Sequence, residues 1–252
     1  KDQPINQEDL DLIHDALLLM KRFKGVPHFD WMDEVERRLY TTSQLGENSK
    51  SVITFQSNLY LKGMDTYFRS LFDAIVNKRV IEIVYHPFGR DPRTITIHPY
   101  HLKQYNNRWF LIGKQTDYDK QLANIAIDRI EGLKETSKSY DPLDDDFDFE
   151  EYFGDVVGVS VNDTPVENVV LYVNDSVIGY IITKPLHESQ CFMPNKMEDG
   201  RWKITLKVKD NYELKSLLRS FGEQIEVMSP ASLRQEMKES TDFMSKMYAE
   251  DK

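Results

Sequence analysis

The sequence predicts an α+β protein with a helical N-terminal segment, a small five-stranded antiparallel barrel, and a C-terminal domain of mixed strands and helices. Apolar residues recur at helical spacing up to about residue 77, and five short strand-like segments then follow one another. After a run of acidic residues the pattern becomes β-α-β-β-α-β, and 252 residues suffice for two cores. We expect a helical connector at 1–63, a barrel at 64–140, an acidic linker at 141–165 and a C-terminal domain at 166–252.

The helical signals come first along the chain. A helix capped by Asn6 should end before Pro27, and a second helix should begin near Asp30. A short strand at 52–55 and a third helix at Thr66–Asn77 complete the connector. An apolar stripe on the first helix, which faces either the core or a second subunit, consists of Leu12, Ala16, Leu19 and Phe23.

Five strand-like segments follow without a crossover helix between them. Turn residues interrupt them, among them Pro87-Phe88-Gly89 and Asn106-Asn107. Short consecutive strands behind a helix predict a small antiparallel barrel of the Sm or SH3 type. The expected strands are Val80–His86, Arg93–Leu102, Arg108–Gln115, Gln121–Ile127 and Ile130–Thr136.

The last third of the chain predicts a ferredoxin-like domain, because its elements follow the order βαββαβ. The expected strands are Val169–Val173, Gln190–Pro194, Trp202–Val208 and Ile225–Met228. The expected helices are Asp175–Thr183, Tyr212–Phe221 and a final one at Ala231–Met247.

Charge is distributed unevenly. The formal net charge of -10 argues against a protein that coats nucleic acid. Residues 78–114 are nevertheless locally basic, with seven Lys or Arg against two acidic residues. Residues 141–155 carry eight acidic residues and no basic one, which is typical of a solvated linker.

Cysteine content and hydropathy bear on the compartment. The single Cys191 excludes an internal disulfide and fits a reducing interior. No apolar run approaches the roughly 20 residues of a membrane helix, and no signal peptide is recognisable. We expect a cytoplasmic protein without membrane contact. The first residue is Lys1 instead of Met, which suggests a trimmed fragment.

The strands between residues 93 and 130 combine aromatic and cationic side chains. Arg93, Arg108 and Arg129 offer forked hydrogen-bond donors, and Trp109 and Phe110 offer stacking surface. This combination suits a planar or phosphate-bearing anion. Trp109 could equally be a core residue, and Arg129 could form a salt bridge with Asp128. A binding surface is therefore favoured over a catalytic one.

Other chemistries have weaker support. We find no nucleophile elbow, P-loop, dinucleotide glycine motif or His-Glu zinc motif, so we expect no enzyme and no cofactor. His86, His98 and His101 lack the spacing of a metal site. The aspartates at 144–148 lack the glycine and terminal glutamate of an EF-hand loop, so we expect no metal there.

The stretch from Val80 to Thr136 resembles the WYL domain family. The Trp-Tyr-Leu triplet stands here as Trp109-Phe110-Leu111, and Ile127-Asp128-Arg129-Ile130 matches the family's last element. The remaining ordered matches are Ile83-Val84-Tyr85, Arg93, Ile95-Thr96-Ile97, Pro99 and Leu102. The C-terminal domain is similar to the WCX extension that accompanies many WYL domains, with Ser189-Gln190, Phe221-Gly222 and Val227-Met228-Ser229-Pro230 in the expected places.

The resemblance implies which residues bind ligand. Phe110 replaces the family tyrosine, and a further family arginine is replaced by Leu122, Ala123 or Asn124, so two contacts are in doubt. His98-Pro99 could instead shape a strand end. The expected ligand-binding residues are Tyr85, Arg93, His98, Arg108, Trp109, Phe110 and Arg129.

The resemblance also implies a function. The chain would be the ligand-sensing and dimerising part of a bacterial-type transcriptional regulator, whose effector is a nucleotide or single-stranded nucleic acid. Operator DNA would be contacted by an N-terminal helix-turn-helix, for which residues 1–60 leave no room. The alternatives are a module that itself binds nucleic acid and an oligomerisation scaffold without a ligand.

Overall fold

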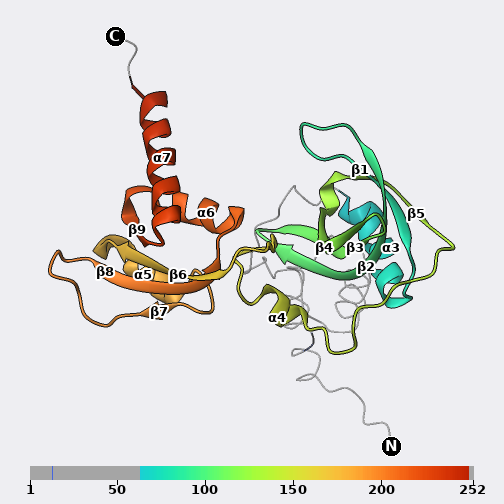
Figure 1. The fold of residues 1–252 in the computed structure, drawn as a ribbon, viewed down its shortest axis with the longest axis horizontal. Helices are drawn as coiled ribbons and strands as arrows, with labels where there is room; N and C mark the ends of the chain where they lie inside the picture. Colours follow the sequence, from blue (N-terminus) through green and yellow to red (C-terminus); the bar gives the residue numbers. More distant parts are fainter. Residues whose placement is uncertain (1–12, 14–62, 250–252) are drawn as a thin grey trace, which may run out of the picture. The chain divides into compact units, whose positions relative to one another are not determined.

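The computed structural model describes Ile13 and residues 63–249, which belong to two compact units, Lys1–Leu143 and Asp144–Lys252 (Figure 1). Each unit has its own sheet and core. The first two expected helices and the strand at 52–55 lie outside the described residues. None of the described helices has the length and hydrophobicity that a bilayer crossing requires.

The first unit begins with a π-helical turn at Met64–Phe68 (η3), which continues directly into α3 (Arg69–Val76). This confirms the helix expected at Thr66–Asn77. Leu71 and Ala74 are fully buried, so one face of α3 packs on the core. The elements that follow are β1 (Ile81–Tyr85), β2 (Arg93–Tyr105), β3 (Arg108–Gln115), β4 (Tyr118–Ala126), the 3-10 turn η4 (Ile127–Arg129) and β5 (Ile130–Glu135).

All five strands belong to one antiparallel sheet with the order β4-β3-β2-β1-β5. Asn106 and Asn107 form the β2–β3 turn with φ angles of 45° and 59°, a conformation that asparagine tolerates well. The edge strands β4 and β5 do not pair with each other, so the described strands form an open sheet and not the closed barrel that we expected. Turn η4 connects β4 at one edge of the sheet to β5 at the other edge, and no backbone hydrogen bonds pair these two strands.

Register shifts interrupt the sheet at two functionally relevant places. One lies between Val84 and Tyr85 in the β1–β5 pairing, and the other lies between Pro99 and His101 in the β2–β3 pairing. A β-bulge breaks the alternation of faces along a strand. Before the β2 irregularity, Ile95, Ile97 and Pro99 are buried on one face of β2, and His98 is buried on the other face, where the Asp141 N–H donates a hydrogen bond to it.

The second unit starts with a short helix, α4 (Phe149–Phe153), inside the segment that we expected to be a solvated linker. Asp148 caps this helix by accepting a hydrogen bond from the Glu150 N–H at 2.8 Å, and Phe153 is 6% exposed. Acidic composition therefore did not prevent a packed helix, because the aromatic residues among the carboxylates supply apolar surface. Phe149, Tyr152 and Phe153 form contacting aromatic rings.

The elements after α4 confirm the expected βαββαβ order. Their antiparallel sheet has the order β7-β8-β6-β9, and its core includes Leu171, Ile204 and Leu206, which are fully buried. The elements are β6 (Val166–Val173), α5 (Asp175–Thr183), β7 (Cys191–Phe192), β8 (Trp202–Lys209), α6 (Tyr212–Arg219), the 3-10 turn η5 (Gly222–Gln224), β9 (Ile225–Ser229) and α7 (Ala231–Met247).

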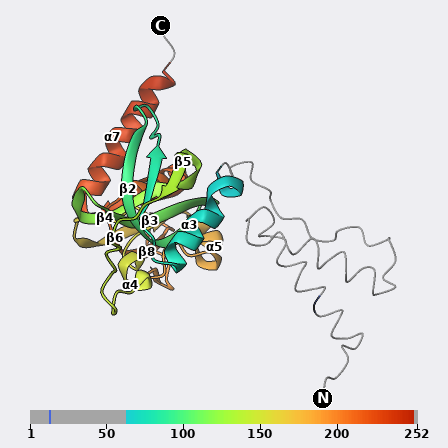
Figure 2. The same cartoon turned by 90° about the vertical axis from the view of Figure 1, so that its right-hand side faces the viewer.

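Helix α7 is attached to its unit mainly through its first turns. Leu233 is its one buried residue, and the C-terminal half is exposed. In Figure 1 α7 leads away from β9 toward the C-terminus, and Figure 2 shows the same helix from the side.

Candidate functional site

Arg108 joins the start of β3 to turn η4. The Asn106-Asn107 turn places Arg108 at the first position of its strand, and its Nε lies 3.3 Å from Oδ2 of Asp128. The two side chains are 34% and 14% exposed, so the pair is partly shielded from water. The other carboxylate oxygen of Asp128 is buried and accepts no hydrogen bond from the described residues.

Arg129, the next residue of η4, stacks on an aromatic ring. Its guanidinium carbon lies 4.1 Å from the centroid of Phe88, and this ring is 71% exposed. The His86 N–H donates to the Arg129 carbonyl at 3.0 Å, which holds turn η4 against the end of β1. The Nε of Arg129 is buried and has no hydrogen-bond partner in the described part of the chain.

Arg93 is exposed and stands opposite Tyr85 in the β1–β2 ladder. Tyr85 stands opposite Ile130 on its other side, and Ile130 directly follows Arg129. Arg93 and Arg129 therefore come from strand ends that flank the same position of β1. Tyr85 itself is 6% exposed and belongs to the core, because strand alternation places it on the same face of β1 as the buried Ile81 and Ile83.

Trp109 and Phe110 divide between the two faces of β3, as strand alternation predicts. The Trp109 ring packs against the core and meets Phe68 edge-on at 5.1 Å between centroids. Its indole N–H is buried and unpartnered among residues 63–249. Phe110 is half-buried and stands opposite Lys103 and Ala126.

His98 is separated from this group by its hydrogen bonding. It is 7% exposed, and its Nδ1 accepts a hydrogen bond from the Asp141 N–H at 3.0 Å. Burial lowers the pKa of His98; Lys114 and Lys138 lower it further, while Asp141 opposes the shift. The ring is thus neutral and holds the segment after β5 against β2.

Other contacts fasten the same segment. Tyr140 donates to the Pro99 carbonyl at 2.8 Å, and Tyr100 donates to the Asp141 carbonyl at 2.7 Å. Burial, together with the Asp141 carboxylate, raises the pKa of Tyr100 to about 12. His98 therefore has a structural task here, which fits the expectation that His98-Pro99 shapes a strand end.

The metal interpretation gains no support from the geometry. His86 Nδ1 lies 2.8 Å from Glu131, and His98 is bonded to backbone. Within the described ranges no group of three His, Cys, Asp or Glu side chains could hold a metal ion.

The structure thus gathers Arg108, Asp128 and Arg129 around turn η4. Arg93 stands at the start of β2, and Phe88 lies in the turn between β1 and β2. Buried polar atoms without partners are rare in folded proteins, and contact with a bound molecule is one of the ways in which such atoms are satisfied. Phe88 escaped the sequence analysis because it stands in a turn between Pro87 and Gly89. The WYL family pattern has a further arginine at one of the positions 122–124, and this chain has Leu122, Ala123 and Asn124 there, none of which is cationic.

Comparisons with known proteins agree with the division into two units. The family model of the WYL domain matches residues 66–135, and that of the WCX domain matches residues 165–243. No curated protein matches the chain.

Two solved structures are distantly similar. Proteasome accessory factor B/C (PafBC) of Arthrobacter aurescens is 19% identical, with a TM-score of 0.32, and the match covers 67% of this chain and 25% of that one. A CRISPR Cas-related protein is 11% identical, with a TM-score of 0.41, and the match covers 98% of this chain and 76% of the other. The chain thus spans about a quarter of the PafBC chain, and no structural conclusion follows from likenesses this weak.

Proposed function

Because the chain carries a WYL domain followed by a WCX domain, we propose that it is the ligand-sensing and dimerising region of a bacterial-type DNA-binding transcriptional regulator. In this proposal the five-stranded sheet binds a negatively charged effector, either a nucleotide or single-stranded nucleic acid. The observation that carries the proposal is the set of three buried, unpartnered polar atoms on Trp109, Asp128 and Arg129.

The chemistry of these atoms favours a nucleotide unit over a bare phosphate ion. Arg93 and Arg129 would hold phosphate oxygens in forked hydrogen bonds, and Phe88 exposes a ring on which a base can stack. The free oxygen of Asp128 is an acceptor, which repels phosphate but suits a base amino group or a ribose hydroxyl. One acceptor among several cationic donors therefore matches a ligand that carries both a phosphate group and a hydrogen-bond donor, such as a base amino group or a ribose hydroxyl.

Regulation requires that the effector favours one of two arrangements of the regulator. We propose that two copies of the chain pair, and that a helix-turn-helix segment outside the present chain contacts operator DNA. No catalytic step belongs to this function. For the fold, the strand order β7-β8-β6-β9 supports a ferredoxin-like second domain, and the antiparallel order of β1 to β5 supports an Sm-like first domain that is open at one seam.

The test is a titration of the chain with a fluorescein-labelled oligothymidylate and, separately, with ATP, at several salt concentrations. The two phosphate contacts, by Arg93 and Arg129, predict a slope of about −1.4 for log K of the oligonucleotide against log salt. Arg93→Ala and Arg129→Ala should each weaken binding about tenfold, as expected for a lost charge-assisted contact.

Arg79→Ala is the matched control. Arg79 is also exposed, but it pairs with Glu135 at 2.6 Å, near the other end of the β1–β5 ladder. Its loss should leave the affinity unchanged. Equal losses in all three variants would mean non-specific attraction, and no binding of either ligand at low salt would remove the effector assignment. In the complete regulator, a normal signal response of Arg93→Ala and Arg129→Ala would favour the scaffold alternative.

A further inference from the structure

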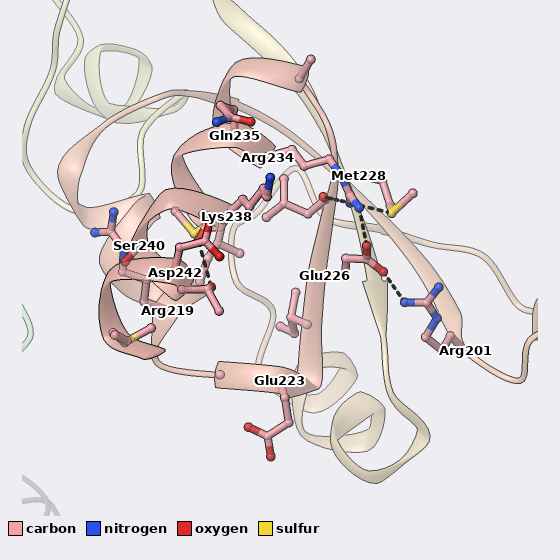
Figure 3. A pocket seen from close by; sticks show the side chains of 18 residues that line it. Arg201, Arg219, Glu223, Glu226, Met228, Arg234, Gln235, Lys238, Ser240 and Asp242 are labelled. Atoms are coloured by element: carbon pink, nitrogen blue, oxygen red, sulfur yellow. Dashed lines mark hydrogen bonds and ion pairs between the residues drawn. The ribbon is translucent and has the colours of Figure 1, made fainter. Parts of the chain in front are cut away.

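A cleft of about 940 Å³ lies within the WCX domain (Figure 3). Its walls are β9, the end of α6 with turn η5, and the first four turns of α7. This volume falls in the range of small-molecule pockets, which is about 300 to 1,000 Å³. The cleft belongs to one compact unit and has no residue in common with the WYL site.

The floor of the cleft is apolar. Leu218 of α6 and Val227 of β9 are almost fully buried beneath it, and Ile225 lies beside them. Three methionines, whose unbranched side chains adapt to varied apolar shapes, contribute to the lining: Met228, Met237 and Met244. Such a lining accepts an apolar body without demanding one shape.

One charged wall of the cleft is already neutralised. Glu226 accepts hydrogen bonds from Arg201 at 2.5 Å and from Arg234 at 2.6 Å. Those two bonds lower the pKa of Glu226, so its carboxylate stays charged. Arg234 also donates to the Val227 carbonyl at 2.5 Å. Both arginines are committed to internal contacts, and Figure 3 shows them meeting at Glu226.

Two other cations of the lining are not committed. Arg219 at the end of α6 and Lys238 on α7 are exposed, and neither forms an ion pair with a carboxylate of the described residues. They come from two different walls of the cleft (Figure 3). The acidic residues nearby are Asp242, one helical turn after Lys238, and Glu223, whose carboxylate points away from α7 in Figure 3. Uncommitted charge in the cleft is therefore mainly positive.

We propose that this cleft is a second ligand site, which binds a small organic anion with an apolar body. Arg219 and Lys238 hold the anionic group, a carboxylate, sulfonate or phosphate, and the apolar body lies on Leu218, Val227 and the methionines. Charge-assisted hydrogen bonds supply the orientation, and buried apolar area supplies most of the affinity.

The probe is 1-anilinonaphthalene-8-sulfonate, an aromatic anion whose fluorescence rises in apolar surroundings, with octanoate as competitor. We expect saturable binding to the chain that octanoate displaces. Arg219→Ala and Lys238→Ala should each weaken the probe about tenfold. Lys246→Ala removes another cation of α7 that does not line the cleft, and it should leave binding unchanged.

Asp242→Asn tests the sign of the ligand charge. An anion should bind a few-fold more tightly once this carboxylate is neutralised, and weaker binding would overturn the assignment to an anion. The proposal also fails if octanoate does not displace the probe, or if Lys246→Ala weakens it as much as Lys238→Ala. These substitutions are at exposed positions, so the fold should persist. Arg93→Ala and Arg129→Ala should not affect the probe, which separates this test from that of the WYL site.

Discussion

Two arginines of the WCX domain and two of the WYL domain differ in how their guanidinium groups are paired. In the WCX domain Arg201 and Arg234 share Glu226, and every one of these contacts is internal. In the WYL domain Arg93 has no carboxylate partner among the described residues, and Arg129 lies on an exposed ring with its Nε unpartnered. The number of arginines therefore does not identify a ligand site. A guanidinium group that is paired with a carboxylate of the same domain has a structural role, whereas an unpaired one is available to a ligand.

The largest effect that can sharpen this comparison comes from a polar side chain of the WYL domain that is committed internally. His98→Leu removes the acceptor of the Asp141 N–H at a buried position, so the free energy of unfolding should fall by about 2 kcal/mol. Calorimetry or urea unfolding measures this. His86→Leu, which affects a half-exposed pair with Glu131, should cost less than about 0.5 kcal/mol.

The same residue gives this domain a pH dependence. Because the pKa of His98 is lower in the folded state than its ordinary 6.5, the unfolded chain takes up a proton first as the pH falls. The unfolding free energy should therefore decline below pH 6.5, by at most about 1.4 kcal/mol per pH unit for this residue. His98→Leu should flatten the decline. Unchanged stability of the wild type between pH 7 and 5 would contradict the structural role of His98.

A smaller effect is expected from the paired arginines of the WCX domain. Glu226→Gln keeps the shape of the side chain but removes the charge between Arg201 and Arg234, which are partly exposed. Solvent screening limits the cost to about 1 kcal/mol of unfolding free energy. Oligonucleotide affinity should stay the same. A loss of affinity without a loss of stability would break the distinction between the two groups of arginines.

The smallest stability effect should come from one of the two arginines that we propose to bind the effector. Arg93→Ala removes an exposed side chain without an ion pair to a described carboxylate, so the unfolding free energy should change by less than about 0.5 kcal/mol. The melting temperature of the variant measures this directly. A large destabilisation would mean that Arg93 has a structural partner and would move it to the group that Arg201 represents.

Local signals predicted the elements of both sheets well. The turn Asn106-Asn107 and the βαββαβ order could be predicted because turn chemistry and apolar spacing depend on neighbouring residues. Local signals could not predict whether the barrel closes, because closure depends on pairing between β4 and β5. No local sequence pattern encodes that pairing.

The candidate site could be predicted only in part. Tyr85 lies on the buried face of β1 together with Ile81 and Ile83, and His98 is buried beneath the segment that contains Asp141. Local sequence did not predict either burial. Asp128 was considered as a partner of Arg129, but its ion pair is with Arg108, twenty positions earlier in the sequence. The WCX cleft has no sequence motif, because its lining is drawn from the end of α6, turn η5, β9, α7 and Arg201, which are spread over more than forty positions of the sequence.

The three methionines around the WCX cleft also make it sensitive to oxidants. Conversion of a thioether to a sulfoxide places a strongly polar S=O group where the lining is otherwise apolar. Met244, which is 42% exposed, is accessible to peroxide from solvent. Oxidative stress would thus change the chemistry of this cavity directly, and methionine sulfoxide reductases would restore it.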